Sequence, residues 1–185
     1  MLVYLQVAVL AHRMANLTVS WDQYNALVER LALIVHESGY DFDQIICIAR
    51  GGMRVGDVLS RIFDQPLAVL ATQSYFANPD KTGEAQGDLT IGQHMAKVNE
   101  RLGARVLLVD DLVDSGKTMH EVVEHLRHRY PGIFSVKTAV IWKKGCSVFT
   151  PDFWADDLPD NPWIHQPFEA YDLMRPGDLA ARLAS

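Results

Sequence analysis

The chain has 185 residues, of which 49% are hydrophobic and 22% are charged. This length suits one domain that buries roughly 70% of its unfolded surface, and the composition excludes an intrinsically disordered protein. Seventeen basic and 23 acidic side chains give a net charge of −6, which argues against general nucleic-acid binding. The chain contains no run of about 18 apolar residues, so we expect no membrane span.

The cysteines and the N-terminal residues bear on cellular location. Cys47 and Cys146 stand far apart, and no basic segment precedes the apolar residues 1–11. These features favour free thiols and a cytoplasmic protein over a secreted one. We interpret residues 1–13 as a possible N-terminal extension, either a short strand or residues upstream of a start at Met14.

Apolar residues alternate along the chain between helical spacing and short continuous runs. A capping box of Ser20 and Gln23 opens the first predicted helix, and Gly39 ends it. The continuous runs predict strands that are buried on both faces, as in a parallel sheet. The expected order is a helix at 20–39, a strand at 45–49, a helix at 55–63, strands at 66–72 and 105–109, a helix at 116–129 and a strand at 134–142. This alternation predicts an α/β fold, in which ligands bind beyond the carboxyl ends of the strands.

Two segments lack this regularity. Residues 73–94 are rich in Gly, Pro, Asn and Asp and contain little apolar material, so we expect a flexible lid there. The tail at 143–185 is rich in Pro, Trp, Phe and Asp, and only its residues 178–183 are predicted to form a helix.

The strongest chemical signal lies between the third predicted strand and the helix after it, in Asp110-Asp111-Leu112-Val113-Asp114-Ser115-Gly116-Lys117-Thr118. Three carboxylates within five residues repel one another, and a divalent cation or a polyhydroxyl ligand would relieve that repulsion. The segment from Ser115 to Thr118 places small and hydroxyl residues at a helix N-terminus, where free N–H groups favour phosphate. The pattern predicts a site for a sugar phosphate held with magnesium.

Together with the hydrophobic residues before it, the stretch from Val106 to Thr118 resembles the signature of the type I phosphoribosyltransferases. The resemblance implies their fold: a mainly parallel twisted sheet flanked by helices, in a single domain over residues 1–185 with a small C-terminal hood at 143–185. It also implies binding of phosphoribosyl pyrophosphate (PRPP), with Asp110 and Asp111 holding the ribose hydroxyls and Mg²⁺. The residues implied to bind the 5′-phosphate are Ser115, Gly116, Lys117 and Thr118.

Two further segments match the same family. Ala49-Arg50-Gly51-Gly52 stands where the family has its pyrophosphate loop, so Arg50 and Gly51 are implied to bind PRPP. Ser74 and Tyr75 resemble the start of the catalytic lid, which closes over PRPP and excludes water. Lys81 is the only lysine or arginine in the polar stretch after them, and it is either a pyrophosphate contact or a solvated side chain.

The tail resembles the hood of xanthine-guanine phosphoribosyltransferases in Trp163-Ile164-His165-Gln166-Pro167-Phe168. The resemblance implies that Trp163 stacks on a purine and that the backbone near Ile164 meets the ring's pyrimidine edge. Lys144, with Lys143 as the alternative, is implied to donate to the 6-oxo group.

Some hood positions depart from that pattern. His165 replaces a glutamate and Phe168 replaces a second tryptophan, which leaves guanine, xanthine and hypoxanthine open as substrates. Glu169 is a candidate to hold metal-bound water.

The resemblance implies a homo-oligomeric purine-salvage enzyme, a dimer or tetramer, that transfers phosphoribose from PRPP to a 6-oxopurine. Mg²⁺ is its cofactor and Asp114 its general base. One alternative is a phosphoribosyltransferase for orotate or adenine, against which Lys144 and Trp163 argue. The other is a PRPP-binding regulator, against which the net charge of −6 and the lack of a helix-turn-helix segment argue. Pyrophosphate release in the presence of PRPP, Mg²⁺ and each base would distinguish them.

Overall fold

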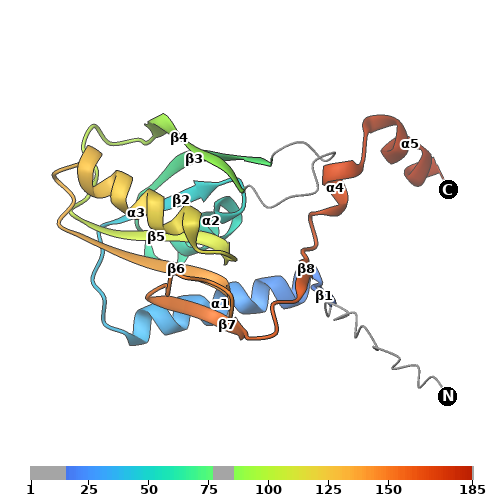
Figure 1. Ribbon diagram of the computed structural model, residues 1–185, viewed down its shortest axis with the longest axis horizontal. Helices are drawn as coiled ribbons and strands as arrows, with labels where there is room; N and C mark the ends of the chain where they lie inside the picture. Colours follow the sequence, from blue (N-terminus) through green and yellow to red (C-terminus); the bar gives the residue numbers. More distant parts are fainter. Residues whose placement is uncertain (1–15, 77–85, 185) are drawn as a thin grey trace, which may run out of the picture.

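The computed structural model describes residues 16–76 and 86–184. Six strands form one sheet in the order β4-β3-β2-β5-β6-β7 (Figure 1), in which all neighbours are parallel except β3 and β4. These strands are β2 (Gln44–Ala49), β3 (Leu67–Phe76), β4 (Gln86–Ala96), β5 (Arg105–Val113), β6 (Ser135–Lys144) and β7 (Phe153–Leu158). Two short strands, β1 (Asn16–Thr18) and β8 (Trp163–His165), form a separate parallel pair. The predicted α/β fold with a mainly parallel sheet is confirmed.

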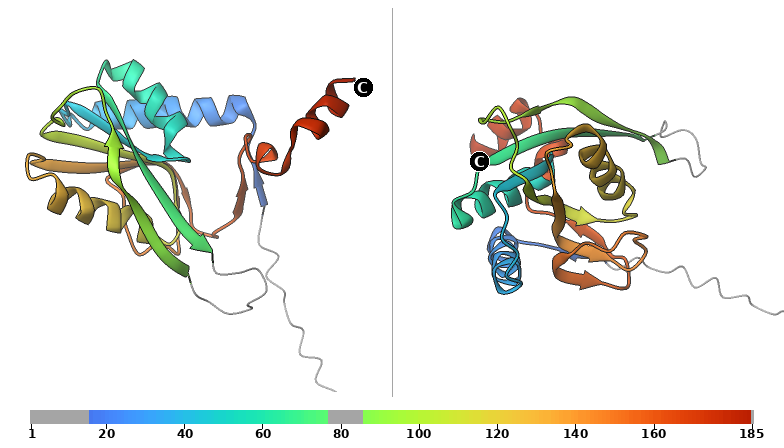
Figure 2. Two further views of the ribbon diagram at one scale, coloured as in Figure 1. Left: turned by 90° about the horizontal axis from the view of Figure 1, so that it is seen from above. Right: turned by 90° about the vertical axis from the view of Figure 1, so that its left-hand side faces the viewer.

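Helices cover both faces of this sheet. The three long ones are α1 (Trp21–Glu37), α2 (Gly52–Phe63) and α3 (Lys117–Arg129). The first two lie on one face and α3 lies on the other (Figure 2). Successive side chains of β2 enter the two cores in turn: Ile45 and Cys47 pack with α1 and α2, whereas Ile46 and Ile48 pack with α3. Burial on both faces explains the continuous apolar runs in the sequence.

The first helix begins where the sequence predicts. The Ser20 Oγ accepts a hydrogen bond from the Gln23 N–H at 3.2 Å, and the Gln23 side chain accepts one from the Ser20 N–H at 2.8 Å. This reciprocal capping satisfies two N–H groups that a helix start otherwise leaves unpaired. The helix then buries Tyr24, Val28 and Leu31 against the sheet.

Strand pairing corrects two boundaries. The stretch at 73–94 is not one irregular lid, because β3 continues to Phe76 and pairs antiparallel with β4, where Gln86 lies opposite Phe76. The third predicted strand continues beyond Val109, because Asp110 remains paired with β6 opposite Val140 and the ladder extends to Val113. The acidic pair therefore lies inside the end of β5 rather than in the loop after it.

The helix predicted at 178–183 is confirmed as α5 (Pro176–Ala184), and the tail contains three further elements that the sequence does not predict: β7, β8 and α4 (Ala170–Leu173). The edge strand β7 buries Phe153 and Ala155 but leaves Trp154 and Asp156 partly exposed. A strand with one polar face lacks the continuous apolar run that is typical of the central strands, so the sequence does not predict β7. The last helix, α5, projects away from the sheet (Figures 1 and 2).

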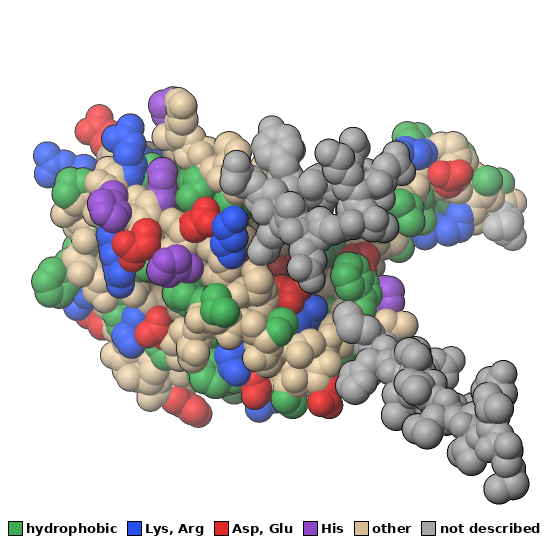
Figure 3. All heavy atoms as spheres, in the orientation of Figure 1, with side chains coloured by type: hydrophobic (Ala, Val, Ile, Leu, Met, Phe, Trp, Pro, Cys, Tyr) green, Lys and Arg blue, Asp and Glu red, His purple; other side chains and the backbone are tan. Residues whose placement is uncertain are grey.

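Acidic and basic side chains are interspersed on the face that carries α3 (Figure 3). Within residues 16–76 and 86–184, no helix combines the length and apolar character needed to cross a membrane.

Candidate active site

The carboxyl ends of the adjacent strands β2 and β5 bring two of the predicted segments together. Arg50 and Gly51 follow β2 directly, and Asp110 and Asp111 lie near the end of β5. Gly51 lies so close to Asp111 that a Cβ on the glycine would overlap the aspartate carboxylate. The absence of a side chain at Gly51 permits this close approach, so the Arg-Gly-Gly loop and the acidic pair form one group of residues. The peptide bond between Ala49 and Arg50 is cis.

Asp110 and Asp111 lie close together at the end of β5, and the charge of Asp111 affects the ionisation of Asp110. The Asp110 Oδ1 accepts a hydrogen bond from the Asp111 N–H at 2.9 Å. Burial, and after it the negative charge of Asp111, raises the pKa of Asp110 well above its ordinary value. A cation or a set of hydroxyl donors would stabilise this pair of carboxylates.

The loop between β5 and α3 is held from outside by the connection that leads to β7. Gly116 has a φ of +85°, and a Cβ there would lie 2.6 Å from both the Phe149 Cβ and the Ser147 Oγ. The backbone oxygen of Ser115 accepts a hydrogen bond from the Val148 N–H at 3.1 Å. Both the backbone angle and the close packing require glycine at position 116.

Lys117 and Thr118 begin α3 directly after this loop. The Lys117 Nζ lies 3.8 Å from the Glu121 carboxylate, one turn further along the helix. The N–H groups of a helix's first turn have no partner inside the helix, and its dipole is positive at this end. The loop and the helix start therefore suit an anion such as phosphate.

Asp114 is the third carboxylate of the motif, and it lies beside two residues from the end of β6. The Lys144 Nζ lies 3.2 Å from the Asp114 Oδ2, and the Cys146 Sγ lies 3.5 Å from the Asp114 Oδ1. Partial burial, and then the hydrogen bond to Asp114, raises the pKa of the Cys146 thiol. Sequence reasoning gave Cys146 no role, since a lone cysteine in a turn carries no pattern.

The two lysines at the end of β6 point to different surroundings. Lys144 is buried and pairs with Asp114, whereas the Lys143 Nζ lies 2.5 Å from the Asp157 carboxylate and 5.2 Å from the Trp154 ring centre. Successive side chains of a strand point to opposite faces, so only one of the two can reach the Asp114 side. The structure brings Lys144, and not Lys143, to the predicted site.

The hood strand β8 exposes one side and buries the other. Ile164 is buried in the core shared with α1, whereas the Trp163 side chain is exposed. Trp163, His165 and Glu169 line a hollow of about 650 Å³, which Lys144 and Asp114 do not line. The structure thus groups the predicted base-binding residues into two sets.

The hood also contacts the acidic pair, through residues to which the sequence-based prediction assigns no role. The Gln166 Nε2 donates to the Asp111 Oδ2 at 2.6 Å. The Phe168 ring lies 5.8 Å from the Tyr24 ring, and the Arg54 guanidinium lies 3.9 Å above its centre. These contacts join segments far apart in the chain, so no local pattern could reveal them.

The predicted lid residues can be placed only in part. Ser74 and Tyr75 lie in the last residues of β3, and Ser74 pairs with Leu89 of β4. Lys81 lies outside the described residues.

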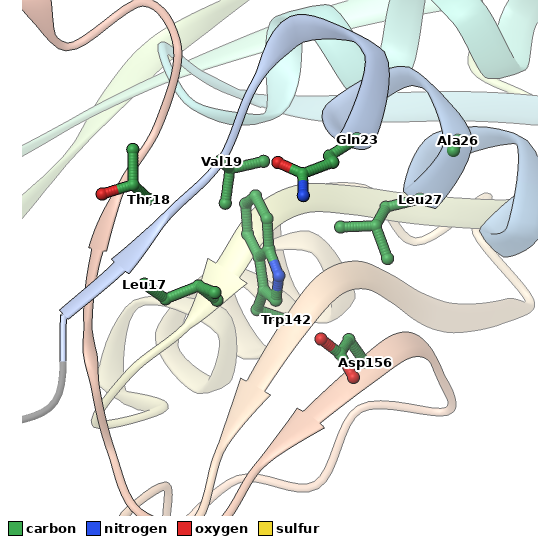
Figure 4. Close-up of a pocket in the computed structure, with 8 residues that line it drawn as sticks. All are labelled: Leu17, Thr18, Val19, Gln23, Ala26, Leu27, Trp142 and Asp156. Atoms are coloured by element: carbon green, nitrogen blue, oxygen red, sulfur yellow. The ribbon is translucent and has the colours of Figure 1, made fainter.

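A second hollow, of about 330 Å³, lies away from these residues (Figure 4). Trp142 of β6 lies between Val19 and Asp156 of β7 in this view. The complete lining is Leu17, Thr18, Val19, Gln23, Ala26, Leu27, Trp142 and Asp156. None of the predicted site residues is among them.

Magnesium is the metal that the acidic pair suits. Mg²⁺ prefers hard oxygen ligands and is usually bound by one or two carboxylates together with water and substrate phosphates. Asp110 and Asp111 provide two such carboxylates, and burial, followed by the negative charge of Asp111, raises the pKa of Asp110. Across the described part of the chain, no three acidic, histidine or cysteine side chains group into a metal site. The residues fit a metal that arrives with a phosphate substrate.

The strand-end carboxylates and the helix start that suits an anion are the arrangement expected of an α/β protein with a phosphorylated-sugar ligand. Residues 20–173 match the phosphoribosyl transferase domain family. The chain belongs to this family and is therefore a phosphoribosyltransferase.

Individual relatives agree with this assignment. The chain is 28% identical over 161 residues to a xanthine-guanine phosphoribosyltransferase of Idiomarina loihiensis, covering 86% of this chain and 91% of the relative. It is similar to the crystal structure of a purine phosphoribosyltransferase from Pyrococcus horikoshii Ot3, with a TM-score of 0.66 and 29% identity over 84% of this chain and 94% of that one. A xanthine-guanine-hypoxanthine phosphoribosyltransferase of Helicobacter pylori shares the fold, with a TM-score of 0.68, 21% identity, and coverage of 91% and 99%.

Proposed function

We propose that this enzyme transfers phosphoribose from PRPP to a 6-oxopurine, namely guanine, xanthine or hypoxanthine. The observation that carries the proposal is the ion pair between Lys144 and Asp114, since Lys144 would donate to a 6-oxo group and Asp114 would accept a proton beside it. The names of the relatives from Idiomarina loihiensis and Pyrococcus horikoshii, at 28% and 29% identity, support a purine acceptor.

The PRPP half of the site would act mainly by positioning. The 5′-phosphate would bind the loop from Ser115 to Thr118, where the helix N-terminus favours an anion. Asp110 and Asp111 would accept hydrogen bonds from the ribose hydroxyls. Arg50 and Gly51 would hold the pyrophosphate. The Arg50 guanidinium is exposed and lies 3.6 Å from the Asp172 carboxylate. On PRPP binding it would leave Asp172 and bind phosphate oxygens instead. Mg²⁺, held by Asp110 and Asp111, would supply positive charge to the departing pyrophosphate.

The base half of the site would read the purine and move one proton. A lysine ammonium has three N–H donors, so Lys144 can keep its bond to Asp114 and also donate to a 6-oxo group. The purine's ring nitrogen forms a bond to C1′ as the bond from C1′ to the pyrophosphate oxygen breaks. Asp114 accepts the proton that the purine's imidazole ring loses. Trp163 would stack on the purine and Ile164 would position the backbone beside it.

The remaining assignments extend this proposal to the rest of the chain. Residues 1–185 would act as one domain, with residues 73–94 as a lid over PRPP and residues 143–185 as the hood. Glu169 would contribute through a metal-bound water. The enzyme would serve purine salvage in the cytoplasm as a homo-oligomer.

An activity assay with separate acceptors tests the proposal. The purified protein is mixed with PRPP, Mg²⁺ and one of guanine, xanthine, hypoxanthine, adenine or orotate, and both pyrophosphate and nucleotide are measured. We expect turnover with at least one 6-oxopurine and background release with adenine and orotate. Turnover only with adenine or orotate would show that this base, and not a 6-oxopurine, is the acceptor. PRPP binding without turnover on any base would favour the regulatory alternative.

A further inference from the structure

Gln166 connects the hood directly to the acidic pair on β5. Its Nε2 lies 2.6 Å from the Asp111 Oδ2, across 55 positions of sequence. A carboxylate can only accept hydrogen bonds, so the amide must present its N–H side to Asp111. A donor to a charged acceptor at this distance forms a strong, directional bond.

The Asp111 carboxylate is confined on its other side by Gly51. A single added Cβ on Gly51 would overlap the carboxylate, which leaves no room for it to swing toward the Arg50 loop. The Asp111 backbone is fixed as well, because it lies in β5 and its N–H donates to the Asp110 Oδ1 at 2.9 Å. Gln166 therefore completes the set of contacts that determine where this carboxylate points.

Gln166 is itself held from both sides. Ile164, two residues before it, is buried in the core and pairs with Leu17 of β1. Phe168, two residues after it, packs against the Tyr24 ring and lies beneath the Arg54 guanidinium. The amide is thus carried on a fixed piece of backbone rather than on a free loop.

The second polar atom of the same amide argues against a purely structural role. Within the described residues, the Gln166 Oε1 is buried and has no hydrogen-bond partner. An unpaired buried acceptor destabilises a protein, whereas Leu or Met would fill the same space without that cost. The amide at position 166 therefore destabilises the protein through its unpaired Oε1, and it supplies the N–H donor to Asp111.

We propose that Gln166 is a positioning residue for Asp111, through which the base-binding hood orients the carboxylate that receives the ribose of PRPP. This inference rests on the proposed function and adds a direct contact from its base-binding half to its PRPP-binding half.

Gln166→Leu tests the proposal, since it removes the donor but keeps the apolar part of the side chain. We expect the Kd for PRPP, measured by calorimetry in Mg²⁺ buffer without base, to rise by about ten-fold, the effect of one hydrogen bond to a charged group. The KM for PRPP should rise in parallel, and the KM for the purine at saturating PRPP should stay within about two-fold. Gln166→Glu keeps the shape but sets a second carboxylate against Asp111, so its loss of PRPP affinity should be larger.

Phe168→Leu is the matched control for a role in hood packing. It loosens the hood against Tyr24 and Arg54 but retains the Gln166 amide as a donor for Asp111, so it should raise the KM for the purine more than the Kd for PRPP. If Gln166→Leu reproduces that pattern, or leaves the Kd for PRPP unchanged, the positioning role is wrong. Gln166→Met carries the same test if the Leu variant does not fold.

The two proposals fail in different ways. A wild-type protein that turns over a 6-oxopurine, with PRPP binding insensitive to Gln166→Leu, keeps the proposed function and overturns the inference. A wild-type protein that binds no PRPP overturns both.

Discussion

The Lys144 Nζ lies 3.2 Å from the Asp114 Oδ2, and the two side chains differ sharply in accessibility: that of Lys144 is 6% exposed and that of Asp114 is 57% exposed. A buried ammonium without a partner is costly, so the ion pair with Asp114 stabilises Lys144 at this depth. The pair thus connects the residue proposed to recognise the base with the residue proposed to move its proton.

Lys144→Met removes the ammonium but keeps an unbranched side chain. We expect kcat/KM for the accepted 6-oxopurines to fall by about 100-fold, because a polar contact in a closed site discriminates strongly. The ratio of kcat/KM for these purines to kcat/KM for adenine should fall, since the lysine does not stabilise bound adenine. Lys143→Met is the control, because that lysine pairs with Asp157, and it should change kcat/KM by less than about three-fold. A larger effect of Lys143→Met than of Lys144→Met would mean that Lys143, and not Lys144, contacts the 6-oxo group.

Asp114→Asn keeps a side-chain oxygen that can accept from Lys144 but cannot accept a proton from the base. We expect kcat to fall by about 100-fold or more, with the Kd for PRPP nearly unchanged. Pre-steady-state and binding measurements separate the two quantities. Asp57→Asn, at an exposed ion pair with Arg61 on α2, should leave both unaffected. Unchanged kcat in Asp114→Asn would remove it as the general base.

Gly116→Ala should weaken binding of the 5′-phosphate and lower stability together. The φ of +85° strains any other residue, and the new Cβ would press on Phe149 and Ser147. We expect a loss of about 1–2 kcal/mol in the free energy of unfolding and a raised Kd for ribose 5-phosphate. Gly177→Ala, where a Cβ meets nothing within 4 Å, should change neither quantity. Full phosphate affinity in a folded Gly116→Ala variant would contradict this account of the loop.

Trp163→Ala and Ile164→Ala should separate base stacking from hood packing. Trp163 is 54% exposed, so its removal should hardly alter Tm. It should weaken the binding of every accepted purine by a similar factor, worth about 1–3 kcal/mol. Ile164 is buried, and its truncation should cost about 2–5 kcal/mol of stability. Thermal unfolding and inhibition by nucleotide product check both. Unequal losses among the purines for Trp163→Ala would mean that it reads the base rather than stacks on it.

Asp110→Asn should stabilise the magnesium-free protein at pH 7. The pKa of Asp110 is raised in the folded state, so folding favours its protonated form, and its ionisation destabilises the fold as pH rises above the carboxyl's ordinary range. The Tm of the variant should exceed that of the wild type at pH 7 in EDTA, and the difference should shrink toward pH 4. PRPP binding should be lost. A variant less stable than wild type at pH 7 would show that the carboxylate is satisfied in the free protein.

The sequence determined the local chemistry of the site. Asp110 to Thr118 pass from a strand through a loop into a helix, and each step is encoded by neighbouring residues: an apolar run, adjacent carboxylates, a glycine and a helix start. The capping box at Ser20 and Gln23 is local in the same sense. Such features follow from backbone preferences and from hydrogen bonds over a few residues, so they can be predicted without knowing the fold.

Tertiary structure alone decided which of two adjacent lysines faces Asp114, because that depends on the register of β6 against β5. It also decided that β7 completes the sheet, since a half-polar edge strand is recognised only by its neighbour. The bond from Gln166 to Asp111 spans 55 residues and forms only after the hood is anchored by Ile164 and Phe168. These contacts depend on packing between distant segments, which no pattern within a short stretch of sequence encodes.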